Sequence, residues 1–269
     1  MSVWFLLLPV LYLLLLLGLY LLQARLVFHP TSNDFFICPE ILSIGGIPVS
    51  KTVEGIEIRY YLREQIGAEN ILIHFHGNGG SACERAYLMK ELLDLPVDLI
   101  FVEHPGYAGT PGSLTQKYYL AYADKVFRTV SSLPENAQKS ILLFGESLGT
   151  GIATWLACKY KISGLVLQAP YTSMSDIAAH RFPLIPARAI IKNPFPASTW
   201  ARSVKCPVLA FHSESDHVIP YSIGVLQSRN FSNLYRFESF QNAGHNDFYT
   251  ADKEKYLDLL KTFIFDVMV

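Results

Sequence analysis

The chain has few cysteines, and they follow no pattern typical of metal or redox chemistry. Four occur among its 269 residues, at positions 38, 83, 158 and 206. No pair has the C-x-x-C spacing of a redox motif, and none has the spacing of zinc ligands. We therefore expect no metal and no cofactor. Cys158 and Cys206 fall in a predicted helix and at the start of a predicted strand, where core packing is expected, whereas Cys38 and Cys83 have no assigned role.

An excess of charge of either sign is also missing. The 22 Lys and Arg residues are balanced by 23 Asp and Glu residues, which gives a formal net charge of -1. Because there is no surplus positive charge, we expect no nucleic-acid partner. There is no internal repeat, and the only low-complexity segment is a run of leucines near the N-terminus. The length suits one catalytic domain with an anchor, and the residues indicate no particular oligomeric state.

Charged side chains are absent from residues 3–22, and twelve of these residues are leucine. As a helix the segment would be about 30 Å long, which is the thickness of a bilayer core. Its leucines alone favour membrane insertion by roughly 4 to 7 kcal/mol. The alternative is a cleaved signal peptide, but Met1 and Ser2 supply no basic region, and residues 22–26 contain no small-residue cleavage site. We predict that residues 1–24 form an uncleaved single-pass anchor, with residues 3–22 in the membrane.

The orientation of that anchor depends on one residue. Arg25 is the only basic residue close to the predicted span. By the positive-inside rule, Arg25 favours a cytoplasmic position for the catalytic domain, residues 25–269.

Beyond the anchor, strand-like and helix-like segments alternate. After a hairpin at 51–62, strands are expected at 71–75, 98–102, 141–144, 165–168, 208–211 and 234–237, and helices at 81–93, 116–131, 147–160, 221–228 and 251–265. This alternation predicts an α/β fold with a mostly parallel sheet and helices on both faces. Ser81 and Glu84 have the spacing of a capping box at the start of the first of these helices.

Ser147 lies at the centre of a G-x-S-x-G motif, Gly145-Glu146-Ser147-Leu148-Gly149. A predicted strand precedes the motif and a predicted helix follows it, which is the setting in which this motif places a nucleophilic serine on a strained turn. The two glycines are needed because side chains at their positions would clash where strand and helix cross. Ser147 is therefore the candidate nucleophile.

Two candidate partners follow Ser147 along the chain. Asp216 comes after the predicted strand 208–211, and His245 comes after the strand 234–237. Nucleophile, acid and then histidine is the order of the α/β-hydrolases. Because the carboxyl ends of parallel strands meet in one crevice, we expect the three residues to converge, with His245 as base and Asp216 as its orienting acid. Asp176 is an alternative acid, and Asp247 is expected to orient the histidine loop.

The chain after its first two dozen residues resembles the α/β-hydrolase superfamily, and within it the small membrane-anchored abhydrolase-domain branch, which includes protein depalmitoylases. The resemblance rests on residues 74–80, 103–109, 145–149 and 244–247. It implies an α/β-hydrolase fold and an oxyanion hole made by the backbone N–H groups of Asn78 and Leu148. The chain departs from the branch at Ser213, where glycine is usual, and at His104, where tyrosine is common.

Two further features bear on the site. His74 and His76 alternate on a predicted strand, but no third ligand stands at metal spacing, so we expect them to support a loop. A proline-broken apolar segment at about residues 177–203 is predicted to be a short lid, with ordinary loop packing as the alternative.

These features together predict a membrane-anchored serine hydrolase acting on carboxylic esters or thioesters. The substrate is expected to be a small molecule or a lipid or other acyl compound, and the anchor and the lid favour fatty acyl groups over acetyl. A serine peptidase or amidase of the same fold is an alternative, because the same triad cleaves amides. A non-catalytic membrane adaptor is a second alternative, although such a protein has no physical need for all three candidate residues.

Overall fold

The computed structural model describes residues 4–268. Within them, eight strands form one sheet in the order β1-β2-β4-β3-β5-β6-β7-β8. β1 pairs antiparallel with β2, and β2 with β4, whereas the other neighbouring strands are parallel. The strands are β1 Ile47–Val53, β2 Ile56–Arg63, β3 Asn70–Phe75, β4 Val97–Val102, β5 Ser140–Glu146, β6 Gly164–Gln168, β7 Val208–Ser213 and β8 Leu234–Phe240.

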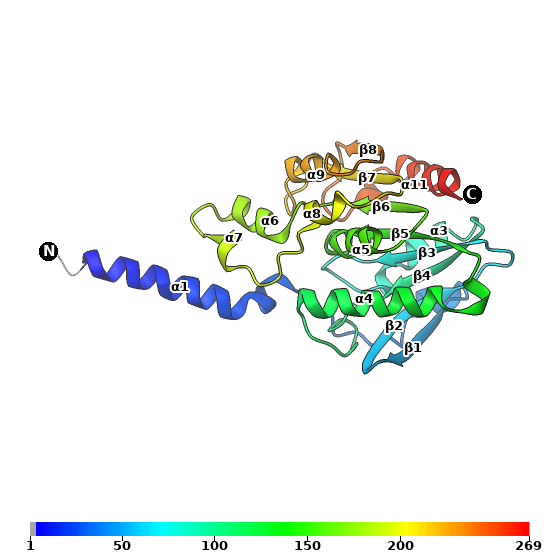
Figure 1. Ribbon diagram of the computed structural model, residues 1–269, viewed down its shortest axis with the longest axis horizontal. Helices are drawn as coiled ribbons and strands as arrows, with labels where there is room; N and C mark the ends of the chain where they lie inside the picture. The colour runs from blue at the N-terminus through cyan, green and yellow to red at the C-terminus, as the bar shows by residue number, and fades with distance from the viewer. Residues whose placement is uncertain (1–3, 269) are drawn as a thin grey trace.

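Helices cover both faces of the sheet, as the alternation of segments predicts (Figure 1). Side chains of α4 and α5 pack against one face, and those of α3 and α11 pack against the other. The helices are α1 Trp4–Val27, α2 Pro39–Ser43, α3 Ala86–Glu91, α4 Gln116–Ser131, α5 Leu148–Lys159, α6 Met174–Arg181, α7 Ala187–Ile190, α8 Ala197–Ala201, α9 Tyr221–Ser228, α10 Phe248–Ala251 and α11 Lys253–Val267, with 3-10 turns η1 Cys83–Arg85 and η2 Pro134–Asn136.

α1 projects away from the body of the molecule, with α6 and α7 beside it (Figure 1). Its segment Leu7–Val27 is long and apolar enough to cross a membrane. Positions 1–3 of the predicted anchor lie outside the described residues. The helix continues past the predicted end at residue 24, and the next residue after it, Phe28, is buried in the core and stacks on Tyr119. The helix therefore joins the domain without a linker.

Two local predictions need correction. The segment 81–93 is not one helix but η1 followed by the shorter α3, and neither begins with a side-chain cap. Ser81 is buried, and its hydroxyl accepts a hydrogen bond from Asn33 Nδ2 at 3.1 Å, so the capping box does not form. At the C-terminus the predicted helix 251–265 is replaced by α10 and α11, because Asp252 caps α11 by accepting from Lys255 N at 3.2 Å.

The crossing of β5 and α5 explains the two glycines of the motif. A Cβ atom on Gly149 would lie 2.1 Å from the carbonyl oxygen of Phe75, and one on Gly145 would lie 2.4 Å from the carbonyl oxygen of Gly149. These neighbours are backbone atoms, which cannot rotate away. The crossing thus requires residues without side chains.

We expect Gly149→Ala to lower the free energy of unfolding by about 2 kcal/mol or more, because the added methyl group overlaps the backbone at the end of β3. Thermal unfolding of the detergent-solubilised protein measures this effect. Gly79→Ala is the matched control, since no described atom lies within 4 Å of the Cβ position there. Equal stability of the two variants would contradict this account of the crossing.

Candidate active site

Ser147 occupies the sharp turn between β5 and α5. Its backbone is left-handed, with φ 47° and ψ -112°, a conformation that residues with side chains rarely adopt. The turn is held by a hydrogen bond from Ser147 N to the carbonyl oxygen of Gln168 at 2.9 Å, and by one from Thr150 Oγ1 to the carbonyl oxygen of Ser147 at 2.6 Å. This geometry is the strained turn that the motif predicts for a nucleophile.

The structure brings Ser147, His245 and Asp216 together. His245 Nε2 lies 2.9 Å from Ser147 Oγ, and His245 Nδ1 lies 2.7 Å from Asp216 Oδ2. The three side chains come from the loops after β5, β7 and β8, at the carboxyl ends of parallel strands. Because an ionised carboxylate only accepts, Nδ1 carries the ring proton, and Nε2 is left to accept from the serine hydroxyl.

Asp216 is held in its ionised form. Burial alone would raise the pKa of its carboxyl group, but hydrogen bonds from His212 and His245 keep that pKa well below its ordinary value. The other oxygen of the carboxylate, Oδ1, accepts from Val218 N at 2.7 Å and Ile219 N at 2.8 Å. The acid is thus fixed in position as well as in charge.

The alternative acid lies elsewhere in the structure. Asp176 is in the first turn of α6, where its carboxylate accepts from Thr172 and Ser173 and pairs with Arg188. Asp176 thus belongs to the first turn of α6, whose N-cap is Ser173, and its carboxylate holds side chains of that turn and Arg188. Asp247 accepts a hydrogen bond from Gly244 N next to His245, and so orients the histidine loop as expected.

Ser213 connects the acid loop to the histidine loop. Its buried hydroxyl donates to the carbonyl oxygen of Ala243 and accepts from Ser215 N at 3.0 Å. Glycine, the usual residue of the branch at this position, has no side chain to make either contact. The only sign of this role in the sequence is that serine stands at position 213, where glycine is usual.

Of the two predicted oxyanion donors, Leu148 directly follows Ser147, and Asn78 lies in the loop after β3. Leu148 is the first residue of α5, so its N–H has no partner within the helix. A Cβ atom on Gly77, beside Asn78, would lie 3.4 Å from Ser147 Cβ, which places that loop against the serine. The side chain of Asn78 faces α1: its Nδ2 donates to the carbonyl oxygen of Val27 at 2.6 Å.

A buried network of histidines and carboxylates lies beneath this loop. His76 Nδ1 is 2.7 Å from the carbonyl oxygen of Gly77, so it carries a proton, and Nε2 is 2.9 Å from Glu103 Oε1. Burial raises the pKa of Glu103 to about 7 and lowers the pKa of His76 well below the ordinary value for histidine. His76 is therefore neutral, and its unprotonated Nε2 faces the carboxyl group of Glu103. His104 Nε2 donates to the carbonyl oxygen of His76 at 2.8 Å, which gives the second departure from the branch a structural role.

His74, the other predicted histidine, contacts a second buried carboxylate. His74 Nε2 lies 2.8 Å from Glu146 Oε1, and Arg85 Nε lies 3.1 Å from Glu146 Oε2. Burial would raise the pKa of Glu146, but the charges of Arg85 and His74 lower it to about 2. Both histidines thus contact protein groups that support the loop, as the sequence analysis expects.

Cys38 and Cys83 form a disulfide, which the sequence analysis did not identify. Their Cα atoms are 5.8 Å apart, within the range for such a bond, although the residues are 45 positions apart in sequence. The bond ties the segment between α1 and α2 to η1, just after the loop that carries Asn78. No spacing rule could have paired them, since only the fold brings them together.

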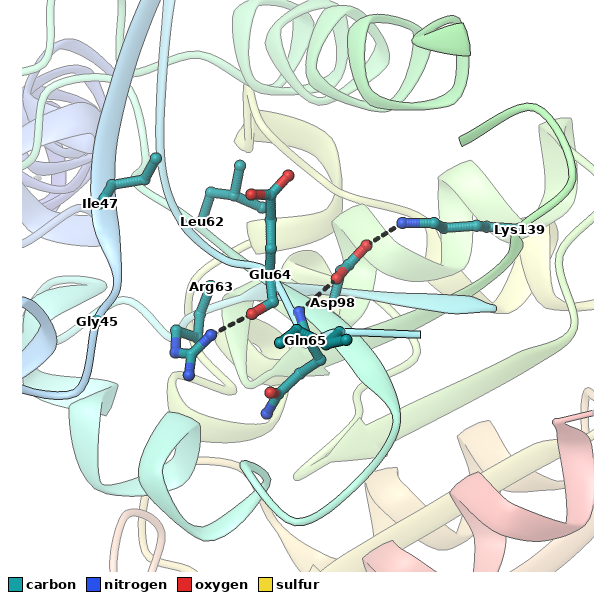
Figure 2. Close-up of a pocket in the computed structure, with 9 residues that line it drawn as sticks. Gly45, Ile47, Leu62, Arg63, Glu64, Gln65, Asp98 and Lys139 are labelled. Atoms are coloured by element: carbon teal, nitrogen blue, oxygen red, sulfur yellow. Dashed lines mark hydrogen bonds and ion pairs between the residues drawn. The ribbon is translucent and has the colours of Figure 1, made fainter. Parts of the chain in front are cut away.

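A separate cavity of about 470 Å³ lies at the other end of the strands. Figure 2 shows Asp98 at its edge, bonded to Lys139 and to the backbone N–H of Gln65. Asp98 stands near the amino end of β4, and Lys139 directly precedes β5, so the cavity is remote from the carboxyl-end crevice that holds Ser147.

Comparison with known proteins agrees with this geometry. Residues 70–189 match a family described as alpha/beta hydrolase fold. An uncharacterized protein of Mycobacterium tuberculosis is 26% identical over 249 residues, covering 92% of this chain and 89% of that protein. The lysophosphatidylserine lipase ABHD12 of Xenopus tropicalis is 25% identical over 223 residues, 71% of this chain and 56% of the lipase. A solved esterase of Pyrococcus furiosus superposes with a TM-score of 0.73 at 15% identity, over 90% of this chain and all of the esterase.

The chain has the α/β-hydrolase fold and has abhydrolase-domain relatives. Its relatives and structural neighbours include esterases and lipases, which supports a hydrolase.

The placement of the two aspartates leads to a direct test. Asp216→Asn should lower kcat by about 10⁴-fold, because the amide favours the wrong tautomer of His245. Asp176→Asn, the matched control, should lower kcat by no more than about 3-fold, since the contacts of Asp176 are confined to the first turn of α6 and a partly exposed ion pair with Arg188, worth about 1 kcal/mol or less. Steady-state hydrolysis of p-nitrophenyl butyrate measures both. If Asp216→Asn stays active while Asp176→Asn is inactive, the acid is misassigned.

Proposed function

We propose that the protein is a membrane-anchored serine hydrolase that cleaves carboxylic ester or thioester bonds through an acyl-enzyme on Ser147. The hydrogen-bonded chain from Ser147 Oγ through His245 to Asp216 is the observation that carries the proposal. No cofactor has a part in it. In domain terms, residues 1–24 are the anchor and residues 25–269 the hydrolase domain.

The proposed reaction has two halves. Ser147 Oγ attacks the acyl carbon while His245 Nε2 takes the serine proton, and the resulting imidazolium is stabilised by Asp216. The proton then passes to the departing alcohol or thiol. A water molecule repeats the sequence in the second half, releasing the acid and restoring the serine. The N–H groups of Leu148 and Asn78 would stabilise the oxyanion, each contributing about 2.7 to 4 kcal/mol.

A lipid or long-chain acyl substrate is favoured by several features. The named relatives include a lysophosphatidylserine lipase and an esterase. The apolar α1 would bring the enzyme to a bilayer, and Phe182 and Leu184 expose 58% and 85% of their surface in the segment beside it.

The predicted lid, residues 177–203, divides into two parts. Its second part is ordinary core packing: Phe195 is fully buried, and Trp200 on α8 packs against the core cluster that includes α5. We therefore propose that only the outer part, α6, α7 and the turn between them, acts as a cover.

The disulfide bears on the side of the membrane. Arg25 alone favours the cytoplasm, but disulfides persist in oxidising compartments and are rare in the cytosol. Since Cys38 and Cys83 are bonded, we propose that the catalytic domain lies on the non-cytoplasmic side.

The substrate proposal is tested with p-nitrophenyl esters from acetyl to octanoyl. Each buried methylene contributes about 0.8 kcal/mol, so kcat/KM should rise roughly fourfold per carbon until the pocket is full. Ser147→Ala should abolish both hydrolysis and fluorophosphonate labelling, while the control Ser175→Ala retains both. A profile that falls with chain length would exclude an acyl pocket, and labelling of Ser147→Ala would exclude Ser147 as the nucleophile.

The orientation is tested by labelling intact cells. Leu226 on α9 exposes 55% of its surface, so Leu226→Cys offers a reactive thiol on the domain. A membrane-impermeant maleimide should label this variant before lysis, and Leu226→Ala reports the background from Cys158 and Cys206. Labelling that appears only after lysis would show that the domain lies in the cytoplasm.

A further inference from the structure

The outer part of the lid, α6, α7 and the turn between them, lies along α1. Its turn contacts a residue deep within the apolar part of that helix. Tyr12 Oη donates to the carbonyl oxygen of Leu184 at 2.6 Å. Tyr12 lies well inside the candidate span Leu7–Val27, fifteen residues before its end, which is about 22 Å along a helix. A membrane around this span would therefore also surround Leu184.

A second set of contacts fixes the other end of the lid to α1. The side-chain amide of Gln23 donates to the carbonyl oxygen of Ile190 at 2.7 Å and accepts from Lys192 N at 2.8 Å. Lys192 Nζ lies 3.9 Å from the centre of the Tyr20 ring. The polar contacts gather near the domain end of the helix, where an aromatic ring and a lysine suit the membrane interface.

The helix face between these contacts is covered. Leu16 and Leu19 are half-buried, on the side of α1 shared with Tyr12 and Gln23, whereas Leu14 is exposed. Figure 1 shows α6 and α7 next to this part of the helix. Hydrogen bonds at Tyr12 and at Gln23 thus join the lid and the anchor at two places along α1.

We infer that the lid tip, Phe182–Ile185, enters the hydrocarbon region of the bilayer beside α1 as a second membrane-embedded element. The inference rests on the proposed function, in that α1 must span a membrane. It adds that the substrate is a lipid ester taken directly from the bilayer, with its acyl chain passing along the lid.

Several backbone groups of the tip are satisfied within the protein, which matters because unpaired polar groups are costly in hydrocarbon. Leu184 N and the carbonyl oxygen of Pro183 make no hydrogen bond among the described residues. Pro183 has no N–H to satisfy. Phe182 N donates to the carbonyl oxygen of Ala178 at 2.9 Å, and Ile185 N donates to that of Phe182 at 2.9 Å. The carbonyl of Leu184 is the one that Tyr12 satisfies.

The charges near the tip are compatible with this depth. Arg181, directly before the tip, is exposed, and its long side chain can extend so that the guanidinium reaches the headgroups. Arg188 is paired with Asp176 at 2.9 Å, so it is not an isolated charge. The tip itself contains only apolar and proline side chains.

Depth-dependent quenching tests the inference on the full-length protein in phosphatidylcholine vesicles. In a Cys158→Ser, Cys206→Ser background, a fluorophore is attached to Leu184→Cys, and vesicles carry nitroxide groups on the lipid acyl chains. Leu14→Cys on the exposed side of α1 reports the anchor, and Leu226→Cys on α9 reports the aqueous domain. We expect quenching at positions 184 and 14, and none at 226.

The reporter positions distinguish a failure of the inserted tip from a failure of the proposal that α1 spans the membrane. Quenching at 14 without quenching at 184 overturns the inserted tip and leaves the anchor intact. Absence of quenching at both positions overturns the anchor, and the inserted tip with it.

A functional arm uses the same position. Leu184→Asp should lower the hydrolysis of a long-chain lipid ester in vesicles by roughly tenfold or more, because a carboxylate is disfavoured in hydrocarbon. Thermal unfolding of this variant in detergent should match that of the parent protein, which shows that the variant is folded. Leu226→Asp is the matched control on the domain surface. Equal turnover of the vesicle substrate by both variants would overturn the inference.

Discussion

The left-handed turn at Ser147 is the constraint on which the rest of the site depends. It exists because Gly145 lets α5 pack against β5, and Gly149 lets α5 pack against the end of β3, in both cases with backbone against backbone. The same crossing puts the N-terminal amide of α5 next to the serine hydroxyl. Asp216 and His245 then need only emerge from strands farther along the sheet, since parallel order brings all these loops to one edge. A single tight crossing thus sets the position of the proposed nucleophile and of one proposed oxyanion donor, and the direction from which His245 approaches.

Beneath the turn, the protein buries charges and polar groups that would be costly without partners. Glu146 is offset by Arg85 and His74, and Glu103 shares hydrogen bonds with His76 and with the backbone N–H of Ala82. None of these groups reaches Ser147 itself. They hold the loop of Gly77 and Asn78 against Ser147, so the network serves geometry. The surroundings of its two carboxyl groups shift their pKa values in opposite directions, upward for Glu103 and downward for Glu146.

The sequence predicts those parts of the structure that local pattern determines. The bounds of α4 and α9 agree with the expected 116–131 and 221–228. The six strands expected after the hairpin appear as β3 to β8. What it does not predict depends on distant partners. Ser81 forms no capping box, and its hydroxyl instead accepts a hydrogen bond from Asn33. The disulfide between Cys38 and Cys83 follows no spacing rule. The hydrogen bond from Lys192 N to the side chain of Gln23 joins residues 169 positions apart. The placement of Ser147, His245 and Asp216 follows from chain order, whereas the contact of Ser213 with Ala243 required the folded loops.

The absence of a linker between α1 and the domain has a geometric consequence. Phe28 is buried directly after the helix, and Asn78 holds the last carbonyl of α1 while its own loop borders Ser147. The helix end and the catalytic crevice are therefore parts of one rigid body. In a membrane, such a body would hold Ser147 Oγ at one fixed distance from the bilayer centre. Substrates would be sorted by how far their scissile bond stands from the bilayer centre, as well as by their chemistry.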